Sequence, residues 1–145
     1  MWFQLLTGAV VSMVNFGIHA LMTGAVVVLT RHTAHRTGES AMFVRLASLL
    51  TITMIALMAA HVIEIAVWAG YYILIGLQFK GITPFEFAFE NYTALGYGDA
   101  LPADTGYRLM GPITSLNGLL LIGWSVAIIF EVMRMAELQF GRHRN

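Results

Sequence analysis

The sequence predicts an all-α membrane protein that crosses the bilayer with three helices. The chain has 145 residues, of which 58% are hydrophobic and only 11% are charged, whereas a soluble domain is about 25% charged. Its mean hydropathy is +0.73. Three runs, each with at most one formal charge, are long enough to cross the hydrocarbon core of a bilayer.

The three predicted spans differ in length. Residues 2–30 contain no Asp, Glu, Lys or Arg and form about 44 Å of helix, more than the hydrocarbon core of ~30 Å requires. No basic residue precedes Arg31, which argues against a secretory signal peptide. Residues 46–79 form about 51 Å and carry one charge, Glu64, and residues 109–130 form about 33 Å.

Charge and cysteine content exclude several classes of protein. The net charge is zero, which argues against a nucleic-acid partner. The chain has no cysteine and therefore no disulfide framework, thiol nucleophile or cysteine-zinc site. No arrangement of a nucleophile with a base is visible, so we expect neither an enzyme nor a cofactor.

The basic residues predict the orientation in the membrane. Six lie between spans one and two or after span three, and two lie between spans two and three. The positive-inside rule therefore places the first loop and the C-terminus in the cytoplasm, and the N-terminus and residues 80–108 outside. We expect a multi-pass protein of the inner (plasma) membrane. The first group is Arg31, Arg36, Arg45, Arg134, Arg142 and Arg144, and the second is Lys80 and Arg108.

The outward segment begins with a predicted short helix. Thr83 can cap it, Pro84 suits the first helical position, and Glu86 stands where a capping-box acid belongs. An apolar helix of about ten residues is typical of a re-entrant segment. Such a segment lies at membrane depth only where protein buries it or where it lines water.

Two glycines at alternate positions follow this helix. Gly96 and Gly98 permit backbone angles that other residues avoid, so successive carbonyls can point the same way. A ring of chains that presents such carbonyls replaces the water shell of a cation. Tyr97, between the glycines, can brace the strand from behind.

These residues resemble the potassium-channel pore module, which consists of an outer helix, a pore helix, a filter strand and an inner helix. The family filter reads Thr-Val-Gly-Tyr-Gly-Asp, and this chain has Ala94-Leu95-Gly96-Tyr97-Gly98-Asp99. The resemblance covers residues from about 42 to 138, and the first span is similar to the extra N-terminal helix of small bacterial ion-channel-like proteins. Further matches are Glu90 as a pore-helix carboxylate, Pro102, Arg108-Leu109 at the start of the inner helix, and Gly118 at its hinge.

The resemblance implies a homotetrameric, potassium-selective channel in the lipid bilayer, with monovalent cations as its permeant ligands. Potassium would bind to the carbonyls of Ala94, Leu95, Gly96 and Tyr97, and Gly98 would complete the filter. Glu90, Thr93 and Asp99 would support it. Either Glu90 and Asp99 share a proton behind the filter, or Asp99 lies in solvent at the outer mouth. The chain then divides into an N-terminal helix (1–30), a cytoplasmic loop (31–45), an outer helix (46–79), a pore helix (83–93), a filter (94–99), an inner helix (105–135) and a tail (136–145).

Ala94 departs from the family pattern, which has Thr or Ser at this position. Without a hydroxyl, the innermost cation site consists of carbonyls and water alone. We expect potassium preference to survive because the stacked carbonyl rings remain, and we expect Ala94→Thr to tighten potassium binding. A weakly selective or non-selective cation channel is the alternative.

Further candidate residues lie in the spans. Gly118 and Gly123 offer hinge points, and Phe130 is a candidate gate on a face that lines the cavity or packs against other helices. His61 and Glu64 lie three residues apart on one helix face. With His19 they form either a metal or proton site or, with Asn15, a hydrogen-bonded lock between spans one and two. A proton-coupled transporter using Glu64 and a non-conducting accessory subunit also stay open.

Overall fold

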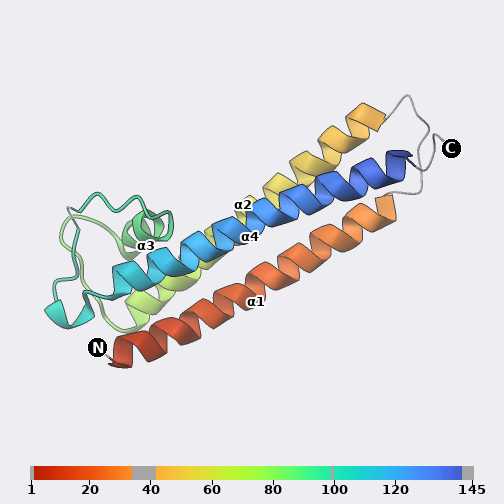
Figure 1. Cartoon of the computed structure of the whole chain (residues 1–145). Helices are drawn as coiled ribbons and strands as arrows, with labels where there is room; N and C mark the ends of the chain where they lie inside the picture. The colour runs from red at the N-terminus through yellow and green to blue at the C-terminus, as the bar shows by residue number, and fades with distance from the viewer. Residues whose placement is uncertain (1, 34–41, 99, 142–145) are drawn as a thin grey trace.

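Three long helices lie side by side and form the body of the molecule (Figure 1). The computed structural model describes residues 2–33, 42–98 and 100–141. Three stretches are long and apolar enough to cross a membrane, namely Trp2–Thr30, Leu46–Leu74 and Thr105–Met135. The predicted all-α class with three spans is therefore confirmed. In order, the elements are α1 (Trp2–Thr33), α2 (Met42–Leu74), α3 (Pro84–Tyr92), the 3-10 turn η2 (Thr105–Tyr107) and α4 (Met110–Gly141).

The short elements gather at one end of the bundle. Figure 1 shows α3 and η2 at the end where the N-terminus lies, whereas α4 ends at the opposite end. The short helix α3 packs against both α2 and α4, and α1 packs against the same two helices. The bundle thus holds the predicted pore helix between the predicted outer and inner helices.

The outer helix α2 ends at Leu74, before the predicted end at residue 79. Gly76 takes a left-handed φ of 68° and ends the helix. Its N–H donates to the Ile73 carbonyl at 3.0 Å, and the Leu77 N–H donates to the Tyr72 carbonyl at 2.9 Å. This pair of bonds is the Schellman motif, in which glycine tolerates the left-handed conformation that stops a helix. The predicted boundary was therefore wrong, although Gly76 marks the correct one in the sequence.

The inner helix α4 begins at Met110 rather than at the predicted residue 105. Residues 105–107 instead form the separate turn η2, capped by Asp104, whose carboxylate accepts the Gly106 N–H at 2.7 Å. Pro112 stands in the first turn of α4, where helix N–H groups have no partner within the helix. The proline therefore costs no hydrogen bond there and marks the start of the helix.

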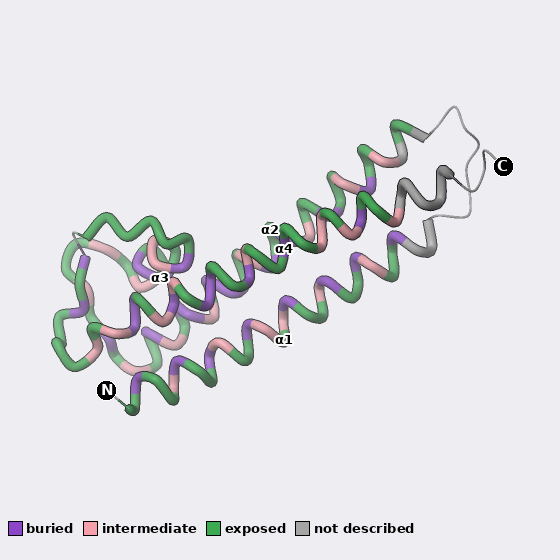
Figure 2. Tube along the Cα trace, in the orientation of Figure 1, coloured by how far each residue is buried: buried purple, intermediate pink, exposed green. Residues whose placement is uncertain are grey.

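The buried face of α1 is unusually polar. Buried positions recur every three or four residues along the helix (Figure 2), whereas large apolar side chains such as Trp2 and Leu21 are exposed. Helices in a bilayer associate through small and polar residues because lipid already solvates apolar ones. This pattern therefore marks α1 as a membrane helix that packs through its polar face. The buried positions are Gln4, Gly8, Val11, Asn15, His19, Thr23, Val26 and Thr30.

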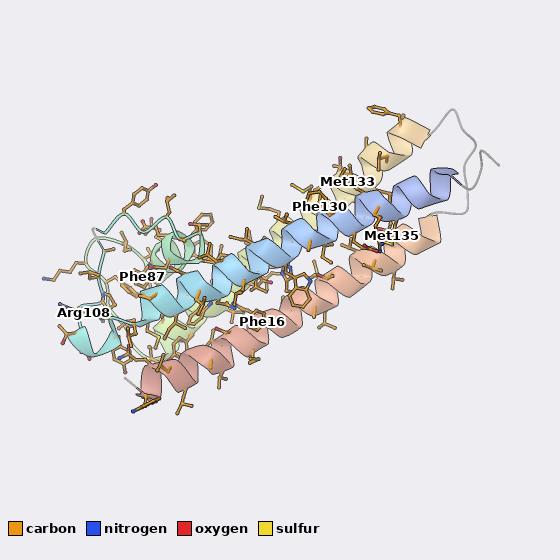
Figure 3. The ribbon with its side chains drawn as sticks, in the orientation of Figure 1. Phe16, Phe87, Arg108, Phe130, Met133 and Met135 are labelled. Atoms are coloured by element: carbon orange, nitrogen blue, oxygen red, sulfur yellow. The ribbon has the colours of Figure 1, made fainter. Side chains whose placement is uncertain are left out.

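An aromatic core holds the short helix α3 against the ends of the long helices. Phe87 of α3 (labelled in Figure 3) stacks on Phe79 with 4.1 Å between ring centroids, and Tyr72 of α2 contacts both rings edge-on. Beyond the predicted filter the chain returns to this core, because the Ala103 N–H donates to the Gln78 carbonyl at 3.0 Å. Both ends of the segment between α2 and α4 are therefore anchored.

We expect the start of α3 to lose stability on acidification. The Glu86 carboxylate accepts the backbone N–H of Thr83 at 2.7 Å, and this bond lowers the pKa of Glu86. A pKa that is lower in the folded state stabilises the fold above the ordinary carboxyl pKa, and the contribution disappears as pH falls through the lowered value. Thermal unfolding at neutral and acidic pH should therefore show a smaller acid-induced loss in Glu86→Gln than in the unmodified chain. Equal losses in the two proteins would contradict this role.

Candidate functional site

The helix α3 points its C-terminal end at the predicted filter. The capping box expected from the sequence is present, since the Thr83 hydroxyl accepts the Glu86 N–H at 3.2 Å and the Glu86 carboxylate accepts the Thr83 N–H. The helix then runs to Tyr92, and only Thr93 separates it from the segment 94–98. The C-terminal end of a helix carries a partial negative charge that favours cations. The capping box fixes where α3 begins, and the direction of the chain then places the negative end of the helix dipole next to 94–98.

The backbone of 94–98 alternates in handedness. Ala94, Gly96 and Gly98 have left-handed φ values of 56°, 41° and 79°, and Ala94 is the only non-glycine residue with positive φ in the described part of the chain. The N–H of Ala94 donates to the Asn91 carbonyl at 2.9 Å, and the Leu95 N–H donates to the Glu90 carbonyl at 2.9 Å. The first N–H groups of this segment are therefore satisfied by the last turn of α3.

The carbonyl groups of the same segment remain available. Within residues 2–33, 42–98 and 100–141, no donor forms a hydrogen bond with the carbonyls of 94–98. The segment is also exposed in the single chain, with Leu95 58% and Tyr97 69% accessible. Backbone carbonyls at membrane depth need a partner. A cation, water or a neighbouring chain can supply it, and carbonyl rings are the ligands that monovalent cations use in filters.

The predicted support residues lie in three different situations. The Thr93 hydroxyl donates to the Phe89 carbonyl at 3.0 Å, so it faces α3. Glu90 is half-buried. Asp99 lies outside the described residues, and its pairing with Glu90 therefore stays a prediction.

The two glycines of the inner helix have different surroundings. A Cβ on Gly118 would overlap the Tyr92 carbonyl oxygen and lie 2.7 Å from its carbonyl carbon. The backbones of α3 and α4 are therefore in close contact at Gly118, which gives this glycine a packing role. A Cβ on Gly123 would meet nothing within 4 Å.

The predicted cavity face of α4 is largely exposed in the single chain. Phe130 is 67% exposed and is labelled in Figure 3, and Leu119 and Val126 on the same stripe are about half exposed. Their exposure fits a face that meets water, lipid or another chain. The gate at Phe130 stays a prediction.

The structure brings His19, His61 and Glu64 together in the middle of the bundle. His19 Nδ1 lies 2.9 Å from one Glu64 oxygen, and His61 Nδ1 lies 3.1 Å from the other. Glu64 and His19 are fully buried. The ligand atoms of these three side chains all lie within 4.8 Å of one another, which is close enough for one small metal ion.

Two further side chains, Tyr92 and Ser125, contact these three residues. We call the five side chains the intramembrane cluster, which consists of His19, His61, Glu64, Tyr92 and Ser125. The Tyr92 hydroxyl donates to Glu64 and lies 2.8 Å from His61 Nδ1. Ser125 Oγ lies 2.9 Å from His61 Nε2 and 3.3 Å from His19 Nε2. The cluster therefore joins α1, α2, α3 and α4 in a single hydrogen-bonded group.

Asn15 adds further hydrogen bonds between the helices beside this cluster, in line with the sequence hypothesis of a hydrogen-bonded link between spans one and two. Its amide donates to the Glu64 backbone carbonyl at 3.2 Å and to Asn117 Oδ1 at 3.0 Å. Trp68 Nε1 also donates to Asn117 Oδ1, at 2.9 Å. Sequence reasoning missed Tyr92, Ser125, Asn117 and Trp68, because each meets its partners only through the crossing of helices distant in the sequence.

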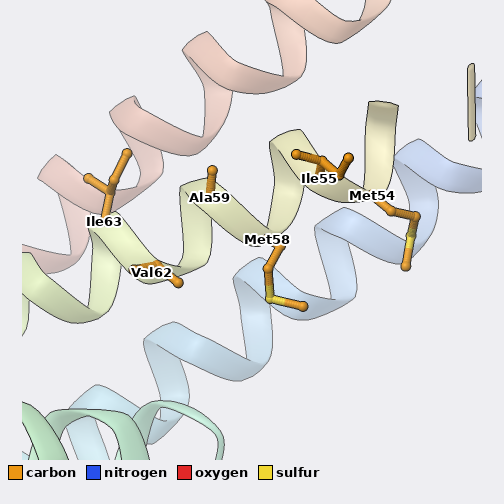
Figure 4. A pocket seen from close by; sticks show the side chains of 6 residues that line it. All are labelled: Met54, Ile55, Met58, Ala59, Val62 and Ile63. Atoms are coloured by element: carbon orange, nitrogen blue, oxygen red, sulfur yellow. The ribbon is translucent and has the colours of Figure 1, made fainter. Parts of the chain in front are cut away.

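An apolar groove follows one face of α2 (Figure 4). None of the side chains that line it is charged or carries an oxygen or nitrogen atom. Such a face suits lipid or another apolar helix rather than a binding site. The groove is lined by Met54, Ile55, Met58, Ala59, Val62 and Ile63.

Comparison with known proteins identifies the module that contains these elements. A family model described as "Ion channel" matches residues 58–135, which is more than half of the chain. The match runs from α2 through α3 and the segment 94–98 into α4, and α1 lies outside it. No curated protein and no solved structure matches the chain. The chain belongs to the ion channel family and is a multi-pass membrane protein of the passive ion-channel type.

Proposed function

We propose that four copies of the chain form a potassium-selective channel around one axis. The observation that carries this proposal is the segment 94–98, in which the first N–H groups bond to α3 while every carbonyl lacks a hydrogen-bond donor in the described residues. One chain supplies one such strand, so a ring of carbonyls requires several chains in closed symmetry. Potassium would bind between the carbonyls of Ala94, Leu95, Gly96 and Tyr97, and Gly98 would follow them at the outer end of the filter.

The proposed orientation in the plasma membrane places the filter outside and the C-terminus in the cytoplasm. The distribution of arginines supports it. The fold is compatible with it, because the N-terminus and the filter segment lie at one end and α4 ends at the other (Figure 1).

Reversal potentials test both the channel and its selectivity. The purified chain alone, reconstituted in liposomes with potassium on one side and sodium on the other, should give a current that reverses near the potassium equilibrium potential. Equal permeability for the two cations would support the weakly selective channel, which the missing hydroxyl at Ala94 favours. Absence of flux from the purified chain would support an accessory subunit. Flux that requires a proton gradient would support a transporter.

The conformation of Ala94 sharpens the expected effect of adding a hydroxyl there. Its φ of 56° is left-handed, a conformation that costs a non-glycine residue roughly 1–2 kcal/mol and is especially unfavourable for β-branched side chains. We therefore expect Ala94→Ser to raise the potassium-to-sodium permeability ratio without loss of stability. Ala94→Thr should give a smaller gain and a lower unfolding temperature, in contrast to the simple expectation from the family filter. A larger gain from threonine than from serine would contradict the left-handed conformation.

A further inference from the structure

The intramembrane cluster contains nitrogen and oxygen atoms that could bind a metal ion other than potassium, the proposed permeant ion. We propose that His19, His61 and Glu64 bind one divalent transition-metal ion of the zinc type per chain. Two imidazole nitrogens and one carboxylate oxygen are a ligand set that proteins use for zinc. Hard cations such as potassium, calcium and magnesium instead require more ligands, and those ligands are oxygens. The filter carbonyls and this cluster would therefore select different ions.

The two histidines are oriented in the same way, and this orientation favours a metal. Each turns Nδ1 toward Glu64 and Nε2 toward Ser125. A metal on both Nδ1 atoms requires the tautomer in which Nε2 carries the proton. Both Nε2–H groups then donate to Ser125 Oγ, whose two lone pairs can accept both bonds. Ser125 thus already stands where an outer-shell partner would hold the two ligands in place.

The same hydrogen bonds are harder to complete without a metal. If both neutral imidazoles donate from Nδ1 to Glu64, both Nε2 atoms need a proton from Ser125, and its hydroxyl has only one. The set closes if one imidazole carries a second proton, or if His61 takes the other tautomer and its Nδ1 accepts the Tyr92 O–H, which then no longer donates to Glu64. A proton is therefore the rival occupant of the cluster, and the two occupants can be distinguished by metal titration.

The fourth position around the metal also has a candidate. Zinc prefers four ligands in a tetrahedron, and the Tyr92 hydroxyl contacts Glu64 and lies 2.8 Å from His61 Nδ1. Tyr92 can approach the metal as a ligand or hold the Glu64 carboxylate by its hydrogen bond. In both cases the ion would connect α1, which lies outside the matched channel module, to the last residue of α3 before the filter. Metal binding would thus fasten the extra helix to the pore module.

Titration of the purified chain tests this site directly and independently of ion conduction. The protein is freed of any polyhistidine tag, kept in detergent and titrated with Zn²⁺ by calorimetry and with Co²⁺ by visible absorption. We expect one ion per chain, a tetrahedral cobalt spectrum, a raised unfolding temperature and zinc–nitrogen distances near 2.0–2.1 Å by X-ray absorption. Loss of an outer-shell partner weakens metal binding about 10–100-fold, so Ser125→Ala should fall in this range.

Variants of the ligands provide the decisive comparison. His19→Gln and His61→Gln should each weaken binding by more than Ser125→Ala does. His35→Gln changes a histidine of the predicted cytoplasmic loop 31–45, outside the described residues, and should leave binding unchanged. Absence of binding to the unmodified chain, or equal affinity in His61→Gln and His35→Gln, would overturn the site. If a ligand variant fails to fold, the cobalt spectra of the unmodified chain and Ser125→Ala decide, and identical spectra and affinities would overturn it. None of these results depends on the potassium proposal, which the reversal potential tests separately.

Discussion

Gly118→Ala is expected to destabilise the protein and abolish ion flux, whereas Gly123→Ala is expected to be tolerated. A Cβ at Gly118 would overlap the Tyr92 carbonyl oxygen, and the nearest atoms are backbone atoms that cannot rotate away. The clash would separate α3 from α4 at Tyr92, the last residue of α3, two residues before the filter segment begins. Overpacking of this kind costs typically about 1–3 kcal/mol and occasionally more.

The matched change at Gly123 controls for helix propensity. Both glycines lie inside α4, and alanine in a helix is favoured over glycine by roughly 0.5–1 kcal/mol at either position. A Cβ at Gly123 meets nothing within 4 Å, so Gly123→Ala should keep or raise the unfolding temperature. The difference between the two variants isolates the contact with α3.

Thermal unfolding and liposome flux together separate packing from hinge motion at Gly118. Close packing predicts a lower unfolding temperature and lost flux in Gly118→Ala. A hinge without close packing predicts an unchanged unfolding temperature and altered opening only. An unfolding temperature equal to that of Gly123→Ala would therefore contradict the α3–α4 contact.

Glu64→Ala is expected to be the most destabilising change within the intramembrane cluster. Glu64 is fully buried and lies within hydrogen-bond distance of side chains on α1, α2 and α3. Its removal takes this partner away from His19, His61 and Tyr92. A buried polar group that is left without a partner costs about 1–3 kcal/mol, and this change removes the partner of several groups at once.

A buried polar residue on another helix, α1, provides the control. Thr23 is buried, and its hydroxyl has no hydrogen-bond partner in the described residues. Thr23→Val removes this hydroxyl with little change of shape and should be neutral or slightly stabilising. In detergent, Glu64→Ala should therefore unfold at a lower temperature than Thr23→Val, with several degrees of difference for each kcal/mol of lost stability. Equal unfolding temperatures would show that the cluster contributes no stability.

Glu64→Gln distinguishes the remaining functions. Glutamine keeps one carbonyl acceptor for the neighbouring donors but cannot carry a proton as a carboxylate does. A channel should therefore retain passive flux in this variant, with reduced stability. A transporter that moves protons through Glu64 would lose transport completely.

Local chemistry made the elements around the filter predictable. The capping box at Thr83 and Glu86 acts between residues in direct sequence proximity, and it is present as expected. The glycines at 96 and 98 marked positions that take a left-handed conformation, and both do. Gly76 also takes a left-handed conformation, and the predicted end of the outer helix at 79 was wrong because this glycine stops the helix earlier.

Long-range packing decided the rest. The sequence contains His19, His61 and Glu64 at plausible positions, but only the crossing of α1, α2 and α4 brings them to Ser125. Tyr92 joins them because Gly118 lets α3 approach α4 closely. The periodicity of apolar residues in the sequence does not predict such contacts, because they depend on how four helices pack together.

The sequence by itself thus determined the membrane class, the three spans and the capped helix that leads to 94–98, because hydropathy and capping are properties of neighbouring residues. Only the tertiary structure decided what α1 does. Its polar stripe packs inward against α2 and α4 and carries His19 and Asn15 into contact with Glu64. In a bilayer, buried polar groups must find partners on other helices, and those partners exist only once the bundle has formed.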